Sequence, residues 1–199
     1  MKVIMATNNE NKVREIRQML EGTPIEIVPL REAGIDVEIE ENGSSFDENA
    51  AIKAEAIRDM TGQLAIADDS GLVIDYLDGA PGIYSSRFLG TDTDYSVKNM
   101  AILDMLDGVP DEQRSARFVC SMAIAYPDGK TEIYQGVMEG RIAYEIAGEG
   151  GFGYDPVFYL PDRGCTSAQL SPEEKNAISH RGNALRKVVD RLKKDVDTN

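Results

Sequence analysis

The feature that most constrains the fold of this chain is the alternation of short apolar runs with longer amphipathic stretches. The chain opens with KVIMAT, an apolar run rich in β-forming residues, which predicts a buried strand. The next stretch, NENKVREIRQMLEG, places Val13, Ile16 and Leu20 on one helical face, and Gly22 can end that helix. The run IEIVPL predicts a second strand. A helix that crosses over between two strands is typical of α/β folds.

The rest of the chain adds further helices and a hairpin. We predict helices in SSFDENAAIKAEAIRDMTG, in DYSVKNMAILDML, from the start of SPEEKNAIS, and in NALRKVVDRLKK. The stretches ARFVCSMAIAY and TEIYQGVMEGRIAYE flank the turn signal PDG and predict a hairpin. In LAIADDSGLVIDYL we expect two strand-like pieces, because Gly71 in DDSG allows a sharp turn between them. Crossovers together with a hairpin indicate an α/β fold with a mixed sheet.

Composition limits the classes of function. The 199 residues carry a net charge of -14, and an acidic surface repels polyanions, so we expect no nucleic-acid partner. No apolar run approaches the roughly 20 residues of a membrane span, and the amino terminus has no signal-peptide pattern. We therefore expect no membrane partner. The two cysteines, Cys120 and Cys165, match neither a disulfide framework nor a metal-ligand spacing, and free thiols indicate the reducing cytoplasm.

A first candidate site is TNNENK, where the first predicted strand passes into the first predicted helix. Unpaired N–H groups and the helix dipole favour an anion there, and Thr7, Asn8, Asn9 and Lys12 add hydrogen-bonding groups and charge. A simple helix cap beside a solvated lysine fits the same residues. The glycines of a Walker loop are missing, so the functional alternative is a phosphate cradle of another kind.

Acidic residues supply a candidate metal site. Asp68 and Asp69 follow the apolar run LAIA, and carboxylates at the end of a buried strand suit a catalytic cleft. Hard oxygen ligands favour Mg²⁺, which takes one or two protein carboxylates together with substrate phosphates. Either Glu40 or Glu41, in VEIEENGSSF, can supply a second carboxylate. An Asp-rich turn and a solvated acidic loop are the structural alternatives.

Two further stretches carry side chains suited to a nucleotide base. In GGFGYDP, glycines around Phe152 and Tyr154 let a flat ring approach the backbone, and aromatic rings stack on nucleobases. Packing of both rings into the core is the alternative. His180, the only histidine, stands beside Arg181, and both can donate to an acceptor on a ligand, although a lone histidine is more often structural. Lys53 adds positive charge, and it also fits an exposed helix lysine.

Together these stretches supply a metal site, a phosphate cradle, a stacking ring and donors that can read the edge of a base. The chain resembles the inosine/xanthosine triphosphate pyrophosphatases, a family that hydrolyses non-standard purine nucleoside triphosphates. The resemblance runs nearly end to end and rests on ATNNENKVREI, SFDENAAIKAEA, ADDSGLVID, GAPGIYSSRF, GEGGFGYDPVF and SPEEKNAISHRGNAL, in the order of the family. Several of these motifs are specific, so their joint occurrence by chance is negligible.

The resemblance implies a role for individual residues. It assigns the metal to Glu41, judged by its distance from Lys53 and with Glu40 as the alternative, and to Asp69, which is also the catalytic proton acceptor. Whether Asp69 or the metal activates the attacking water stays open. The implied substrate-binding residues are Thr7, Asn8, Asn9 and Lys12 for the triphosphate, Lys53, Ser70 beside Asp69, the base-binding loop of Phe152, Gly153, Tyr154 and Asp155 with Phe152 as the stacking ring, and Lys175, His180 and Arg181 for phosphate and base.

The resemblance also implies a reaction and an architecture. The reaction is NTP + H₂O → NMP + pyrophosphate with Mg²⁺ as cofactor, on ITP, dITP or XTP, and the preference among these substrates stays open. The implied fold is a single two-lobed domain over residues 1–199, an elongated mixed β-sheet with flanking helices around a central nucleotide-binding cleft. We expect a homodimer in the cytoplasm.

Two other classes of function stay open at this point. One is a nucleotide sensor that binds the triphosphate without cleaving it, and the other is a phosphatase that removes the γ-phosphate. A purely structural protein fits least, because the motifs lie in turns, where packing needs them least.

Overall fold

The computed structural model describes residues 1–197 and consists of two compact units. The first unit contains Met1–Asp69, Cys120–Gly136 and the residues from His180 onward. The second unit contains Ser70–Val119 and Val137–Ser179. Each unit is therefore assembled from segments that lie far apart in the sequence.

A mixed seven-stranded sheet, in the order β2-β1-β3-β4-β5-β6-β7, forms the frame of the fold. Its strands are β1 Lys2–Met5, β2 Glu26–Pro29, β3 Ala65–Ile74, β4 Ser115–Ala125, β5 Thr131–Ile142, β6 Phe158–Leu160 and β7 Cys165–Thr166. β1 pairs in parallel with β2 and β3, whereas β6 pairs antiparallel with β5 and β7. The expectation of an α/β fold with a mixed sheet is confirmed.

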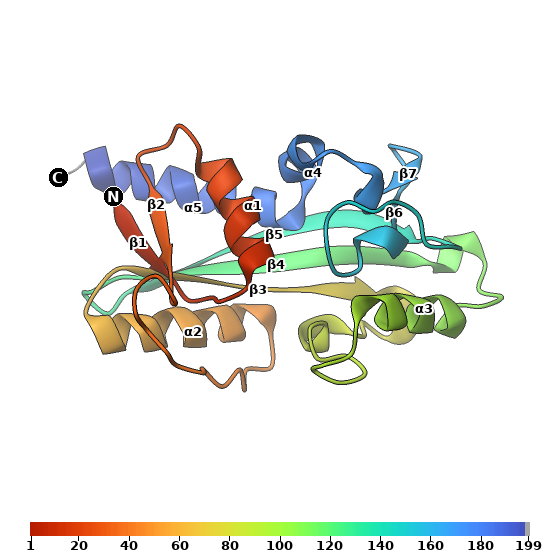
Figure 1. The fold of residues 1–199 in the computed structure, drawn as a ribbon, viewed down its shortest axis with the longest axis horizontal. Helices are drawn as coiled ribbons and strands as arrows, with labels where there is room; N and C mark the ends of the chain where they lie inside the picture. Colours follow the sequence, from red (N-terminus) through yellow and green to blue (C-terminus); the bar gives the residue numbers. More distant parts are fainter. Residues whose placement is uncertain (198–199) are drawn as a thin grey trace. The chain divides into compact units, whose positions relative to one another are not determined.

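Five α-helices and five short 3₁₀ helices complete the described residues. They are α1 Glu10–Leu20, α2 Phe46–Thr61, α3 Tyr95–Met105, α4 Pro172–Ile178, α5 His180–Asp197, η1 Asp75–Leu77, η2 Gly82–Tyr84, η3 Asp111–Gln113, η4 Asp155–Val157 and η5 Ser167–Gln169. In the first unit, α1 and α5 lie on one side of the sheet and α2 lies on the other (Figure 1).

Strand alternation divides the apolar side chains of the first unit between two cores. Val3 and Met5 of β1 pack with α1 and α5, whereas Ile4 and Ala6 pack with α2. This follows from the period of two along a strand, which sends neighbouring side chains to opposite faces. The predicted face of α1, formed by Val13, Ile16 and Leu20, is buried against these cores. The helices α2 and α5 also bury one face each, and the residues concerned are Ala50, Ala54, Ile57, Leu185, Val188, Val189 and Leu192.

Local signals set the ends of the helices. The side chain of Asn9 caps α1, because it accepts from the backbone N–H groups of residues 11 and 12. Ser45 caps α2, which ends at Gly62 in the left-handed conformation, φ 67°. Ser171 and Glu174 form a capping box at the start of α4.

The second unit has a core of its own. Leu72 and Ile74 of β3 pack with Ile102 of α3 and with Phe158 of β6 in this cluster. The predicted hairpin is present, since β4 and β5 are neighbours in the sheet and Tyr126 N–H donates to the Lys130 carbonyl at 2.8 Å across the turn.

Two parts of the sheet differ from the sequence-based expectation. β3 is one strand from residue 65 to residue 74, not two pieces, and Gly71 continues it instead of turning. Asp68 and Asp69 consequently lie inside a strand, which tolerates them because both carboxylates find polar partners. Strands β6 and β7 were not predicted, since three and two residues are too few to show alternation.

The last helix also begins earlier than predicted, at His180 instead of residue 183. Its first turn rests directly on the backbone of β5 at Gly136. A Cβ built on Gly136 would lie 2.1 Å from the His180 carbonyl oxygen and 2.5 Å from the Ala184 nitrogen. Because only glycine allows this approach, Gly136 determines where His180 sits.

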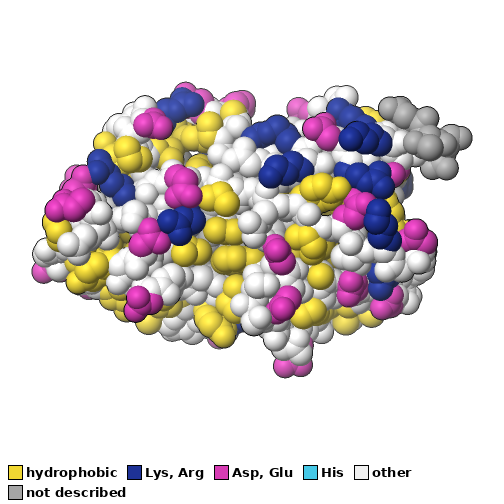
Figure 2. All heavy atoms as spheres, turned by 180° about the vertical axis from the view of Figure 1, so that it is seen from behind, with side chains coloured by type: hydrophobic (Ala, Val, Ile, Leu, Met, Phe, Trp, Pro, Cys, Tyr) yellow, Lys and Arg dark blue, Asp and Glu magenta, His cyan; other side chains and the backbone are white. Residues whose placement is uncertain are grey.

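The surface carries both signs of charge. Figure 2 shows acidic and basic side chains interspersed on one face, with Lys and Arg gathered toward the end of α5. Over residues 1–197, no helix combines the length and the apolar character that a membrane crossing requires.

Candidate functional site

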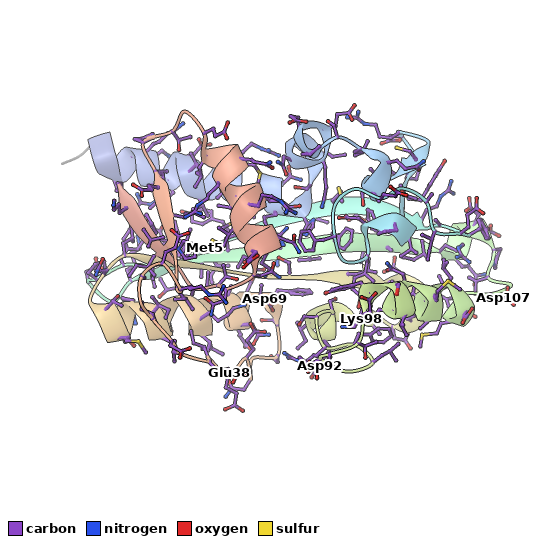
Figure 3. The ribbon with its side chains drawn as sticks, viewed as in Figure 1. Met5, Glu38, Asp69, Asp92, Lys98 and Asp107 are labelled. Atoms are coloured by element: carbon purple, nitrogen blue, oxygen red, sulfur yellow. The ribbon has the colours of Figure 1, made fainter. Side chains whose placement is uncertain are left out.

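Two neighbouring carboxylates of β3 point to opposite sides of the sheet in the first unit. Ala65 and Ala67 pack in the core of α2, and Ile66 packs in the core of α1 and α5. By the same alternation, Asp69 lies on the side of α2 (Figure 3), and Asp68 lies on the side of α1 and α5. The two aspartates therefore meet different partners.

On the side of α2, three charged groups converge. The Nζ atom of Lys53 lies 2.6 Å from Oε1 of Glu41 and 3.8 Å from Oδ1 of Asp69. It also donates to the backbone carbonyl of Asp68 at 2.8 Å. Lys53 is 8% exposed, so the reading of this residue as an exposed helix lysine is wrong. Two carboxylates thus share one buried ammonium.

The pKa values reflect this arrangement. Burial by itself lowers the pKa of Lys53, but the carboxylates of Asp68, Asp69 and Glu41 outweigh burial and raise it. Burial raises the pKa of Asp69; Lys53 opposes that shift, and Glu41 adds to it. The net increase means that Lys53 does not offset the cost of burying the charged carboxylate of Asp69.

On the side of α1 and α5, Asp68 lies between two cations. Its Oδ2 atom lies 2.9 Å from Nζ of Lys12 and 3.5 Å from Nε of Arg181. Arg181 also forms an ion pair with Glu15 of α1. Burial opposes the ionisation of Asp68, but Lys12 and Arg181 hold the pKa of Asp68 far below its ordinary value. Asp68 is therefore a buried counter-ion.

The turn before α1 uses its side chains for local structure. Oγ1 of Thr7 accepts from Asn9 N–H at 3.2 Å, and Oδ1 of Asn9 accepts from Lys12 N–H at 3.2 Å. Asn8 is exposed. The helix cap, which the sequence allowed as one of two alternatives, is thus present. It places the backbone of Lys12 in the first turn of α1.

His180 and Arg181 form the start of α5, where both side chains are buried, at 5% and 2% exposure. The backbone of His180 packs closely against β5 at Gly136. Arg181 joins the ion pairs with Asp68 and Glu15, so its orientation is fixed by two carboxylates.

The two carboxylates on the side of α2, those of Glu41 and Asp69, have the chemistry of ligands for a small divalent cation. Glu41 and Asp69 already direct carboxylate oxygens at one positive charge, that of Lys53. Mg²⁺ takes one or two such carboxylates and completes its shell with water and phosphate oxygens. In the described part of the chain, no three or more His, Cys, Asp and Glu side chains gather as a metal site made by protein ligands alone. Glu40 is exposed, so Glu41 fits the role better.

In the second unit, Asp155 organises the glycine-rich loop. Its Oδ2 atom accepts from Phe152 N–H at 2.8 Å and from Nζ of Lys175 at 2.6 Å, and its Oδ1 atom accepts from Ser167 at 2.7 Å. The Nζ atom of Lys175 also lies 5.0 Å from the centroid of the Phe152 ring. The buried ion pair of Asp155 and Lys175 thus holds the glycine-rich loop and contacts the ring of Phe152.

The other residues of this loop behave differently from Phe152. Tyr154 packs in the core, 3% exposed, and its hydroxyl donates to the Ser85 carbonyl at 2.7 Å. The core alternative therefore applies to Tyr154. The Gly153 carbonyl accepts from Nδ2 of Asn99 at 3.1 Å, and Gly153 has a φ of 69°. Ser70 follows Asp69 in β3 and is half-buried.

Sequence reasoning missed two buried polar residues, Asn49 and Glu15, and did not find the partner of a third, Asp68. Asn49 donates to Asp69 at 3.1 Å, Glu15 pairs with Arg181, and Asp68 pairs with Lys12. One signal was available for Glu15 and Asn49, because each stands on the apolar side of a helix that the periodicity had identified. Asp68 was noticed, but its partner could not be read from its neighbours in the chain.

Comparison with known proteins places the chain in a family. The Ham1 family model matches residues 3–191. A protein named dITP/XTP pyrophosphatase from Desulforamulus reducens is 48% identical over 192 residues, which cover 96% of each chain. A protein of the same name from Bacillus licheniformis is 50% identical over 186 residues, covering 94% of this chain and 95% of the relative.

Solved structures agree with the sequence comparison. The Staphylococcus aureus Ham1 protein has a TM-score of 0.88 and 37% identity, covering 98% of this chain and all of the other. A HAM1 protein from Coxiella burnetii has a TM-score of 0.88 and 41% identity, covering 98% and 99%. The resemblance drawn from the motifs is confirmed, and the chain belongs to the Ham1 family.

Proposed function

We propose that this chain hydrolyses dITP, ITP and XTP to the monophosphate and pyrophosphate, and so removes deaminated purines from the nucleotide pool. Full-length relatives that carry the name dITP/XTP pyrophosphatase support the substrate class. The observation that carries the proposal is the convergence of Glu41 and Asp69 on Lys53, with Lys12 on the other side of β3.

Glu41 and Asp69 are the residues proposed to hold Mg²⁺. When bound, Mg²⁺ supplies positive charge to the phosphate oxygens. Lys53 lies beside both carboxylates, so it can neutralise charge in the same place. Lys12 carries a second ammonium near the start of α1, where helix N–H groups favour an anion. These groups offset the acidic balance of the chain where a triphosphate binds.

The proposed chemical step is attack of water on the α-phosphorus. A bond forms between the water oxygen and the α-phosphorus, and the bond from that phosphorus to the bridging oxygen of the β-phosphate breaks. Pyrophosphate leaves with the electrons of that bond, and Asp69 takes the proton from water. Asp69 is the proton acceptor that the resemblance implies, and in the chain without metal burial raises the pKa of its carboxyl.

Recognition of the base is proposed to use hydrogen-bond donors and one ring. Hypoxanthine and xanthine carry an acceptor at position 6, whereas adenine carries a donor there. His180 and Arg181 are proposed to donate hydrogen bonds to position 6 of hypoxanthine or xanthine. With adenine, one of these donors would be left unpaired, which is costly in a buried site. Phe152, held by Lys175 and Asp155, is the proposed stacking ring. Guanine also carries an acceptor at position 6, so its rejection depends on position 2.

We further propose that the protein is a cytoplasmic homodimer that binds neither nucleic acid nor membrane. The net charge of -14 supports the absence of a polyanion partner. Sedimentation analysis of the purified chain tests the oligomeric state, and a monomer at micromolar concentration would contradict the homodimer.

The experiment that tests the proposed function is a panel of nucleoside triphosphates assayed with Mg²⁺ for each product. We expect IMP and pyrophosphate from ITP, with much slower cleavage of ATP and GTP. Release of IDP and phosphate would identify a γ-phosphatase instead. Tight binding of ITP without any cleavage would identify a nucleotide sensor.

A further inference from the structure

Asn49, in the first turns of α2, makes two hydrogen bonds in opposite directions. Its side chain is fully buried. Nδ2 donates to Oδ2 of Asp69 at 3.1 Å, and Oδ1 accepts from the backbone N–H of Gly43 at 2.9 Å. Asn49 thus connects Asp69 of β3 with the loop that precedes α2.

The chemistry of the partners determines the orientation of the amide. The Gly43 N–H can only donate, so it must face the oxygen of the amide. An ionised carboxylate such as Asp69 only accepts, so it must face the nitrogen. With Oδ2 of Asp69 engaged by Asn49, the Oδ1 atom is the one that lies 3.8 Å from Lys53. The amide therefore selects which oxygen of Asp69 faces the ammonium.

The loop on the other side of Asn49 carries Glu41, two residues before Gly43. Glycine is required there, because a Cβ on Gly43 would lie 2.7 Å from Oδ1 of Asn49 and 2.8 Å from Cβ of Glu48. Glu48 also holds Ser44 of this loop, accepting from its N–H at 2.6 Å and from its hydroxyl at 2.7 Å. Hydrogen bonds from Gly43 and Ser44 to side chains of α2 consequently hold the loop in place just after Glu41.

We propose that Asn49 is a positioning residue that sets the orientation and spacing of Glu41 and Asp69 for a divalent cation. This inference rests on the proposed function of these two carboxylates. Asn49 acts through both of them. Its amide nitrogen fixes the orientation of the Asp69 carboxylate, and its amide oxygen holds the loop that carries Glu41. A neutral amide achieves this without adding charge, whereas a lysine or aspartate in its place would change the electrostatics that bind the cation.

The test compares three variants in the full chain. Asn49→Leu keeps a similar volume and removes both hydrogen bonds. Gly43→Ala leaves Asn49 in place and pushes the loop away from it. Ser121→Ala is the matched control, because the buried Ser121 hydroxyl donates to Asp47 of the same helix turn at 2.5 Å and touches neither carboxylate. Calorimetric titration with Mn²⁺ in the absence of nucleotide measures cation affinity, and circular dichroism verifies folding.

We expect the Kd for Mn²⁺ to rise by about 10–100-fold in Asn49→Leu and to rise also in Gly43→Ala, which is the usual effect of removing a residue that orients metal ligands. The Mg²⁺ concentration for half-maximal ITP cleavage should rise in parallel, while KM for ITP at saturating Mg²⁺ stays within about twofold. Ser121→Ala should lower Tm without changing the Kd.

Two results would overturn the proposal. One is a wild-type Kd for Mn²⁺ in folded Asn49→Leu, and the other is an equal loss of affinity in Ser121→Ala, which would assign the effect to loosening of α2. The outcome is separable from that of the proposed function. A wild-type chain that binds Mn²⁺ but does not cleave ITP contradicts the reaction, and the three-way comparison of Mn²⁺ affinities is still decisive for Asn49.

Discussion

The two sides of β3 in the first unit carry adjacent aspartates in opposite electrostatic situations. Toward α1 and α5, Asp68 faces Lys12 and Arg181, of which Arg181 also pairs with Glu15, and the pKa of Asp68 is held far below the ordinary value. Toward α2, Asp69 and Glu41 share Lys53, and burial raises the pKa of Asp69 although Lys53 opposes that shift. The ion pairs toward α1 and α5 join two cations to two carboxylates, whereas those toward α2 join one ammonium to two carboxylates.

The difference separates a structural role from a chemical one. A carboxylate between two cations is already compensated, so it stabilises the fold and holds Lys12 and Arg181 in place. A carboxylate that shares one ammonium with another acid gains from any additional cation. The comparison therefore supports the proposal that Asp69 is a ligand of a divalent ion, and it gives Asp68 the role of holding the cations around it.

The largest expected effect is on turnover. Asp69→Asn keeps the hydrogen-bonding shape but removes the proton acceptor and a cation ligand, so kcat for ITP should fall by about 10²–10⁴-fold. Pyrophosphate release at saturating Mg²⁺ measures this. Asp59→Asn, an exposed aspartate of α2, is the control and should keep wild-type kcat. Near-normal turnover in Asp69→Asn would remove the distinction between the two aspartates.

The next effect is on stability. Asp68→Asn leaves Lys12 and Arg181 without their shared carboxylate, and breaking a buried ion pair costs about 3–5 kcal/mol. Arg181 keeps Glu15, so we expect the lower end, about 3 kcal/mol. Urea unfolding at pH 7 measures the change in the free energy of unfolding. A stability equal to wild type would show that Asp68 is not the support inferred for it.

A smaller effect is expected on the choice of base. His180→Ala removes one proposed donor to position 6, and a buried hydrogen bond contributes about 1–3 kcal/mol, or roughly 5- to 150-fold, to discrimination. The ratio of kcat/KM for ITP to that for ATP should narrow by this amount. An unchanged ratio of kcat/KM would show that the residues on the side of α1 and α5 have a structural function alone.

The smallest effect concerns the pH dependence of stability without metal. Because the folded state raises the pKa of Asp69, ionisation of Asp69 destabilises the fold, and stability is lost as pH rises from the unfolded pKa through the folded pKa. For Asp68 the folded pKa is lowered, so its contribution is present above the unfolded pKa and is lost as pH falls.

Tm measured in EDTA from acid to neutral pH tests both signs. Asp69→Asn should gain Tm relative to wild type as pH rises, and Asp68→Asn should lose Tm relative to wild type as pH rises. Parallel curves for the two variants would contradict the electrostatic comparison.

Much of the fold and of the site could be predicted from sequence. The buried face of α1, the existence of the five helices, the hairpin and the helix cap before α1 follow from local patterns, because each depends on residues a few positions apart. The motifs around Lys12, Asp69 and His180 indicated the family. The unbroken course of β3 was not predictable in this way, since DDSG is a turn signal wherever the carboxylates lack buried partners.

The sequence by itself determined the order of the main helices and strands and indicated the residue types of the candidate site, because these depend on periodicity and on composition. Only the tertiary structure decided which cation meets which aspartate and that Asn49 joins Asp69 to Gly43. The reason is geometric: alternation sends Asp68 and Asp69 to opposite faces of one strand, and the partners on each face come from helices that packing alone brings there.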